Sequence, residues 1–152
     1  MLIALSSDAL PGPALRIVES HGVRRWSHIA FGYEAGEAEL VMQASLEADI
    51  GAGSGNCTLV QLGTPSAAIE EAFNRTMRDA DLGKVMRLPG ALSAKRYRLE
   101  AKVGRCTWES LTIYGFEGDQ AETTQALVDC ADVWEGDPSC IVMRVESEEA
   151  AP

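Results

Sequence analysis

The chain of 152 residues is 46% hydrophobic and 24% charged, which is the composition of one globular domain. Its formal net charge of −10 argues against general nucleic-acid binding, because contacts with phosphates need a net positive face. No run approaches the ~20 apolar residues of a membrane-spanning helix, so no membrane span is predicted.

The charges are unevenly distributed along the chain. Residues 75–105 hold nine of the thirteen Lys and Arg residues, whereas residues 106–152 hold eleven acidic residues and Arg144 as their one base. We interpret the basic stretch either as a solvated face or as a local patch that attracts anions.

The four cysteines, Cys57, Cys106, Cys130 and Cys140, show no CxxC spacing. The two histidines, His21 and His28, are the imidazole ligands that could join them, so neither a zinc site nor another cofactor is predicted. The apolar start of the chain is short and lacks a basic leader, so it predicts a strand and no signal peptide. A cytoplasmic protein with reduced thiols is therefore expected, or one associated with a phage particle.

The first third of the chain predicts a strand, a short helix and a hairpin. Residues 2–6 (LIALS) suit a buried strand, and residues 13–19 suit a helix with Pro in its first turn. Residues 26–32 predict a strand, 34–37 a turn, and 38–44 the strand that returns beside it.

The middle of the chain contains the clearest helical pattern. Residues 51–56 (GAGSGN) predict a loop, because they lack the Lys and Ser or Thr of a phosphate-binding loop. Residues 57–62 predict a strand, and 64–82 a helix that Thr caps and one apolar stripe follows. Residues 84–100 indicate a loop with a short element.

The last third predicts a helix and a closing strand. Asp119 and Glu122 resemble a capping box, and a helical stripe follows as far as Gly136. Residues 140–145 (CIVMRV) predict a strand. We expect one domain over residues 1–145 and a disordered acidic tail over 146–152.

His28 lies in an apolar strand, where it is either a core residue bonded to a carbonyl or half of a catalytic pair. Of the four cysteines, Cys106 alone is placed where a helix could begin, and there the backbone amides and Arg105 would lower its pKa. Residues 107–116 also have good strand propensity, so the segment is open to both interpretations. The alternative for Cys106 is an inert buried thiol.

The motif Trp26-Ser27-His28-Ile29-Ala30 resembles the histidine motif of the permuted papain-like fold of the NlpC-type superfamily, in its YiiX-like and lecithin-retinol-acyltransferase-like branches. Gln43 falls where these proteins carry the residue that orients the histidine. Cys106-Thr107-Trp108-Glu109 resembles their nucleophile motif, with the spacing shifted by one residue. The resemblance covers residues 2–116 in order and spacing.

The resemblance implies a small α+β fold, an antiparallel sheet packed with helices, and a cysteine hydrolase. Cys106 would attack a carbonyl, His28 would take and return the proton, and Gln43 would hold the imidazole. The substrate would be an amide, ester or thioester, with peptidoglycan peptide as the first candidate. The resemblance implies no cofactor or metal.

A second reading of the sequence has no catalytic centre. The chain from Cys57 and the chain from Cys106 both open with Cys-Thr and both follow a strand, helix, strand pattern. Two such units would form a ferredoxin-like α+β sandwich with a structural or assembly role, such as a phage particle component with a protein partner. Residues 107–116 separate the two readings, since they are a strand in this one and a helix in the other.

Overall fold

The computed structural model describes residues 1–10, 14–21, 26–34, 37–63, 85–104, 108–135 and 141–147, with the backbone alone over 130–135. The helix expected over 64–82 and the candidate nucleophile Cys106 lie outside these described residues.

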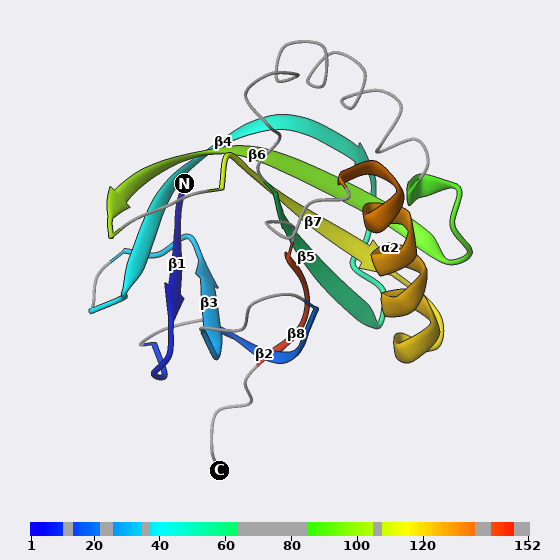
Figure 1. Cartoon of the computed structure of the whole chain (residues 1–152), viewed down its shortest axis with the longest axis horizontal. Coiled ribbons are helices and arrows are strands. Elements are labelled where there is room, and N and C mark those ends of the chain that lie inside the picture. Colours follow the sequence, from blue (N-terminus) through cyan, green and yellow to red (C-terminus); the bar gives the residue numbers. More distant parts are fainter. Residues whose placement is uncertain are drawn as a thin grey trace.

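Among the described residues, eight strands and a helix follow one another in chain order (Figure 1). They are β1 (Leu2–Ser6), β2 (Leu15–His21), β3 (His28–Phe31), β4 (Leu40–Gly51), β5 (Cys57–Gly63), β6 (Ala91–Val103), β7 (Ser110–Phe116), α2 (Gln120–Glu135) and β8 (Ile141–Ser147).

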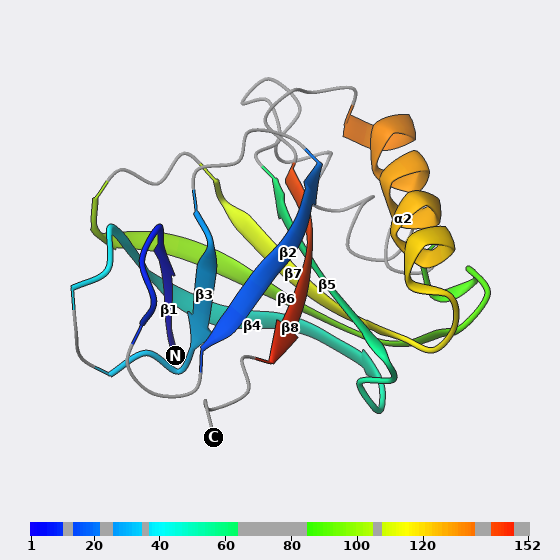
Figure 2. The ribbon, with the colours of Figure 1, turned by 90° about the horizontal axis from the view of Figure 1, so that it is seen from below.

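The strands form a closed barrel in the order β1-β3-β2-β8-β5-β7-β6-β4, and β4 pairs with β1 to complete the ring. Every neighbouring pair is antiparallel. Figure 2 shows α2 outside this ring, so the helix covers the barrel and takes no part in closing it.

The expected α+β fold class is wrong: the described residues form a closed antiparallel β-barrel, not an antiparallel sheet packed with helices or a ferredoxin-like sandwich. The decisive segment is Ser110–Phe116, which is the strand β7, with β5 on one side and β6 on the other. Two hydrogen-bonded neighbours and burial on both faces favour the strand over a helix with the same apolar residues.

The helix expected over 13–19 is also wrong, because Leu15–His21 is the strand β2. Ile17 is buried in the barrel, whereas Arg16 is exposed, and Arg16 and Ile17 pair with residues of β8. Buried and exposed side chains therefore alternate, as in a strand. The strand prevails over the short helical pattern because pairing with β8 satisfies the hydrogen-bonding groups of its backbone.

The expected hairpin of residues 26–32 and 38–44 does not form, although both segments contribute strands. β1 lies between β3 and β4: Ile3 is opposite Phe31 on one side and opposite Met42 on the other. The turn signal predicted that β3 and β4 pair directly, but β1 lies between them.

Several expected elements are confirmed. β1, β5 and β8 match the strands predicted at 2–6, 57–62 and 140–145 within two residues. The helix predicted from Asp119 is α2, and the Asp119 carboxylate accepts a hydrogen bond of 2.9 Å from the Glu122 amide.

Two other expectations differ from the structure. β8 continues to Ser147, which includes the first two residues of the expected tail. The loop expected over most of 84–100 is instead β6 from Ala91 onward.

The core has two main parts, divided by the barrel wall. Inside, large apolar side chains of all eight strands pack on one another, including Ile3, Leu5, Ile17, Ile29, Met42, Leu62, Leu111 and Met143. Outside, α2 packs Leu127 against Cys57, Leu59 and Val142 of β5 and β8. The barrel wall is therefore buried on both faces where the helix crosses it.

The strands differ in length, and this opens the barrel at one end. β4 pairs with β1 over Leu40–Gln43, and the Ala44 amide donates to the Met1 carbonyl. From Ser45 to Gly51 the pairing partner of β4 among the described residues is β6. β4 and β6 therefore extend beyond β1 as a curved flap, which crosses the top of Figure 1.

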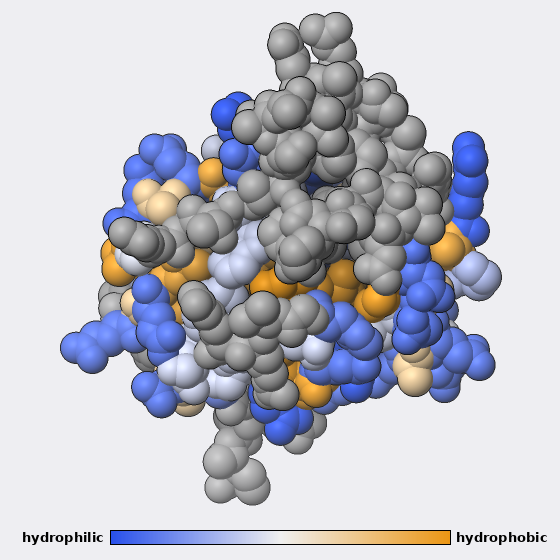
Figure 3. Space-filling model, in the orientation of Figure 1, coloured by the Kyte–Doolittle hydropathy of each residue, from blue (hydrophilic) through white to orange (hydrophobic). Residues whose placement is uncertain are grey.

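The described surface is mostly hydrophilic at its periphery (Figure 3). Large exposed hydrophobic side chains in the described ranges are Met1, Leu46, Ile50 and Val103. Across those same ranges, no helix combines the length and the apolar composition that crossing a bilayer requires.

Candidate functional site

A cavity of about 530 Å³ opens at the end of the barrel where β4 and β6 extend beyond β1. Its walls come from β4, β5, β6 and β7, and Met1 and Phe31 close the side where β1 and β3 are short. We call this cavity the mouth of the barrel.

The register of the strands explains why the mouth is hollow. Gly51, Ser93, Gly115 and Thr58 lie opposite one another in a row across β4, β6, β7 and β5. None of these residues carries a large side chain, so the row leaves space inside the barrel. Two rows further in, Tyr97, Leu111 and Leu62 are opposite one another on β6, β7 and β5, and their side chains fill the interior.

The rim of the mouth is formed by the glycine-rich loop between β4 and β5, which was predicted as a loop. The Ser93 hydroxyl donates a hydrogen bond of 2.5 Å to the Gly53 carbonyl, which lies against Gly115. A Cβ on Gly115 would lie 2.7 Å from that carbonyl oxygen, and one on Gly55 would lie 2.0 Å from the Phe116 oxygen. The glycines therefore let the loop pack directly on the barrel wall.

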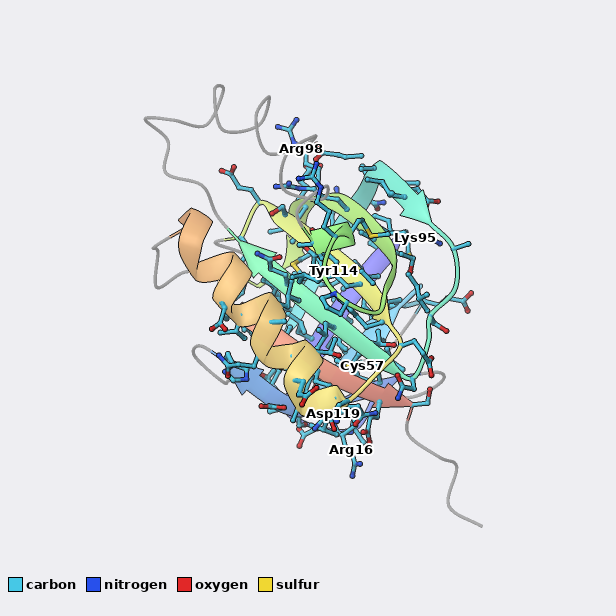
Figure 4. All side chains as sticks on the ribbon, turned by 90° about the vertical axis from the view of Figure 1, so that its right-hand side faces the viewer. Arg16, Cys57, Lys95, Arg98, Tyr114 and Asp119 are labelled. Carbon is cyan, nitrogen blue, oxygen red and sulfur yellow. The ribbon has the colours of Figure 1, made fainter. Side chains whose placement is uncertain are left out.

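Charged and hydroxyl groups lie in the mouth beside its apolar walls. Lys95 of β6 is directly opposite Asp49 of β4, and both line the cavity. Tyr97 follows Lys95 toward the interior, and Ile113 lies opposite Lys95 on β7. Figure 4 shows Lys95 on the opposite side of the barrel from Arg16 of β2.

His28, the predicted base, is the first residue of β3 and lies half-buried at the other end of the barrel. Its Nδ1 is 2.7 Å from the Ser27 hydroxyl, which is also 2.7 Å from the Ser7 carbonyl oxygen. If Nδ1 donates to Ser27 and Ser27 donates to Ser7, Nε2 carries the lone pair that a base needs.

The carboxylate of Glu39 extends this cluster. It accepts hydrogen bonds from the hydroxyl and the backbone amide of Ser7. These two bonds, the hydroxyl first, hold the pKa of Glu39 below its ordinary value. Ser27, Ser7 and Glu39 are therefore among the polar groups near His28.

Gln43, the predicted orienting residue, does not contact His28. Gln43 lies opposite Leu2 and His28 lies opposite Ser6, so the two are at opposite ends of β1. Four strand residues separate those positions by about 13 Å. The Gln43 side chain instead donates to the Met1 carbonyl at 3.3 Å. Its assignment as the third catalytic residue is wrong, because β1 lies between the two strands.

The described residues on either side of Cys106 lie at the His28 end of the barrel. The ring of Trp108 packs edge-to-face on Trp26 at a centroid separation of 5.2 Å. A Cβ on Gly104 would lie 2.5 Å from the Glu39 carbonyl oxygen. Because β7 follows instead of a helix, the expected lowering of the Cys106 pKa by a helix N-terminus loses its basis.

Cys57, by contrast, is a buried thiol under α2. Burial raises the pKa of Cys57, and this effect outweighs the opposite influence of Arg144 and of a hydrogen bond with Thr124. Such a thiol is a poor nucleophile at neutral pH.

The mouth residues Lys95 and Asp49 were not singled out from the sequence. The available signal is the alternation in ALSAKRYRLEAKV, which places Lys95 on the same face as Tyr97 and Leu99. A lysine on the core face of a strand indicates a water-filled interior, but residues 84–100 were interpreted as a loop.

No group of three or more His, Cys, Asp and Glu side chains in the described ranges is arranged to hold a metal ion. Comparison of the chain with models of protein families, with curated protein sequences and with solved structures finds no match.

Proposed function

We propose that this protein binds a small amphipathic molecule in the mouth of the barrel. The observation that carries the proposal is a cavity of about 530 Å³ whose walls combine apolar side chains with a few charged and hydroxyl groups. Pockets for small ligands have volumes of about 300–1,000 Å³ and this mixed lining.

The apolar and the charged residues that line the mouth favour different parts of a ligand. Phe31 and Ile113 are half-buried apolar side chains that line the cavity, and they favour an apolar body. Lys95 and Asp49 are exposed at its edge and favour a polar group that stays near water. This arrangement suits a ligand with one apolar and one polar end.

The rim is also suited to binding with little rearrangement. Ser93 holds the Gly53 carbonyl, and Gly55 forms a bridge with Phe116, so the loop is fixed to two strands. A preformed rim avoids the entropic cost of ordering a loop around the ligand.

The proposal is tested with N-phenyl-1-naphthylamine, a neutral fluorophore that becomes bright in apolar surroundings. We expect saturable binding of about one molecule per chain, since the mouth is a single preformed pocket. Ile113→Trp should abolish binding by filling the cavity. Val103→Trp, at an exposed position of the same barrel, is the matched control and should bind as the parent does.

Circular dichroism melting of both variants separates loss of binding from loss of fold. Binding that does not saturate, or that survives Ile113→Trp in a folded protein, contradicts the proposal.

A second candidate function is acyl or peptide hydrolysis by Cys106 and His28. The contact of Trp108 with Trp26 supports it, because it brings residues close to Cys106 and His28 in the chain to one end of the barrel. This candidate no longer has Gln43 as a member and does not depend on a papain-like fold.

Labelling with iodoacetamide at pH 7, read by peptide mass spectrometry, tests this candidate. An activated thiolate predicts that Cys106 reacts faster than the buried Cys57, and that His28→Ala slows the labelling of Cys106 while His21→Ala leaves its rate unchanged. Slow labelling of Cys106 that is unaffected by His28→Ala contradicts it.

A further inference from the structure

We propose that the mouth recognises a zwitterionic head group of the amino-acid type, with an ammonium beside a carboxylate on an apolar body. The ligand carboxylate binds Lys95, the ligand ammonium binds Asp49, and the apolar body lies against Phe31 and Ile113. This inference rests on the proposed function and adds the chemical class of the ligand.

The two charged residues of the mouth, Asp49 and Lys95, are next to each other. Asp49 and Lys95 are directly opposite each other in the antiparallel ladder of β4 and β6, and both line the mouth. Directly opposed residues on one face have Cβ atoms about 5 Å apart. A positive and a negative group are therefore presented side by side to the same cavity.

Neither Lys95 nor Asp49 forms an ion pair within the described part of the chain. No ion pair within 4.0 Å is formed by Lys95 or Asp49 there, although the two are neighbours. On the outer face of the barrel, by contrast, Arg144 contacts both Glu19 and Glu146 at 3.4 and 3.1 Å. Both charges of the mouth are thus open to a ligand.

The charges of Lys95 and Asp49 together determine which charges the ligand carries. A simple anion gains the attraction of Lys95 but meets the repulsion of Asp49, and a simple cation meets the reverse. An adjacent ammonium and carboxylate complement both groups at once. Binding of a single charge would also leave the second protein charge without a partner as the ligand displaces its water.

The side chains inward from the two charges are suited to the apolar body of the ligand. Inward from Lys95 the next residue on the same face of β6 is the half-buried Tyr97, and Ile113 lies opposite Lys95 on β7. Phe31 contributes to the same lining from β3. A head group held by Lys95 and Asp49 therefore directs its substituent toward aromatic and aliphatic side chains, which favour an apolar amino acid.

The test uses four probes that share one apolar body. They are L-phenylalanine, 3-phenylpropionate, 2-phenylethylamine and 3-phenylpropanol, each used to displace N-phenyl-1-naphthylamine at pH 7 and low salt. Phenylalanine should displace the fluorophore at a concentration at least tenfold lower than each of the other three. Only phenylalanine carries both head-group charges.

Two variants and two matched controls assign the effect to residues. Lys95→Met and Asp49→Asn should each remove the tenfold advantage of phenylalanine while the fluorophore still binds. Lys102→Met and Glu100→Gln neutralise charges on the same strand that pair with each other at 3.9 Å on the exposed side, and they should leave the advantage intact.

Every other outcome overturns the inference in a recognisable way. If 3-phenylpropionate or 2-phenylethylamine matches phenylalanine, the site reads one charge. If all four probes act equally, or if none displaces the bound fluorophore, the head group is not read although the cavity binds ligands. If the fluorophore itself does not bind, the proposed function fails with it.

Discussion

Lys95 occupies a position on β6 where a barrel strand would ordinarily present an apolar side chain to the core. Its neighbours across the strands are Asp49 and Ile113, and the row beyond it consists of Gly51, Ser93, Gly115 and Thr58. The small residues of that row leave room for water, so the ammonium stays hydrated and the charge is tolerated. The inward position of the Lys95 charge is therefore tolerated because of small residues on four strands.

Glu39 provides a test of an individual hydrogen bond. Its carboxylate accepts from the hydroxyl and amide of Ser7, which lowers its pKa. Ser7→Ala removes the larger of these effects, so the pKa of Glu39 should rise toward its ordinary value. The titration is followed by NMR of the Glu39 side-chain carboxyl.

The sign of the stability change follows from the same shift. A carboxyl whose pKa is lower in the folded state stabilises the fold at pH values above its unfolded pKa, and this contribution is lost as the pH falls through the folded pKa. Ser7→Ala should therefore lower the melting temperature at pH 7, and the effect of the pKa change should vanish at strongly acid pH. Ser45→Ala, at an exposed serine of β4, is the control. An unchanged Glu39 titration contradicts this assignment.

At the scale of elements, pairing partners decided conformations that local sequence left open. Residues 107–116 carry both a helical face and good strand propensity, and the ladders with β5 and β6 fix Ser110–Phe116 as β7. In contrast, α2 was predictable because its signals are local: Asp119 caps its first turn and an apolar stripe follows. Local signals suffice where the hydrogen bonds are local.

The contact between the rim loop and β7 gives a test at this scale. Gly115→Ala places a Cβ 2.7 Å from the Gly53 oxygen and 2.9 Å from the Ser54 Cα, so backbone must move. We expect the free energy of unfolding to fall by about 1–3 kcal/mol, measured by urea denaturation. Binding at the mouth should weaken at the same time, because the loop forms its rim.

Gly32→Ala is the comparison for Gly115→Ala. A Cβ on Gly32 meets nothing within 4 Å, but its φ of +73° strains a side chain. It should cost about 1 kcal/mol of stability and leave the mouth unaffected. A Gly115→Ala variant as stable as the parent would show that the rim loop is not packed on β7.

At the scale of the whole molecule, the barrel is held together by seams of unequal length. β4 and β6 share ten registered pairs, whereas β2 and β3 share the two pairs Leu15↔Ile29 and Arg16↔His28. A hydrogen bond from the Ile17 amide to the Ser27 carbonyl extends this short seam. The ring is therefore weakest between β2 and β3.

Native-state hydrogen exchange tests this ranking. The amides that cross between β2 and β3 should exchange through a local opening of lower free energy than those between β4 and β6, which should exchange close to global unfolding. Equal protection of both seams would show that the barrel opens as one unit. The ranking needs no variant, and residue-resolved NMR measures it directly.

The sequence by itself determined the elements whose signals are local. Short apolar runs at 2–6, 57–62 and 140–145 predicted strands, the acidic cap at Asp119 predicted α2, and the glycines of 51–56 predicted a loop. It predicted a helix over 13–19, where Leu15–His21 is a strand, because short segments carry weak periodicity. It also paired residues 26–32 with 38–44, because a turn signal says nothing about a third strand.

The tertiary structure decided the order of the strands, the closure of the ring and the mouth. β1 separates His28 from Gln43, and four strands bring Gly51, Ser93, Gly115 and Thr58 into one row that leaves the cavity open. The physical reason is that strand pairing joins residues far apart in the chain, and its energy depends on which partner is present. No local pattern records that partner, so the cavity and its charges exist only in the folded barrel.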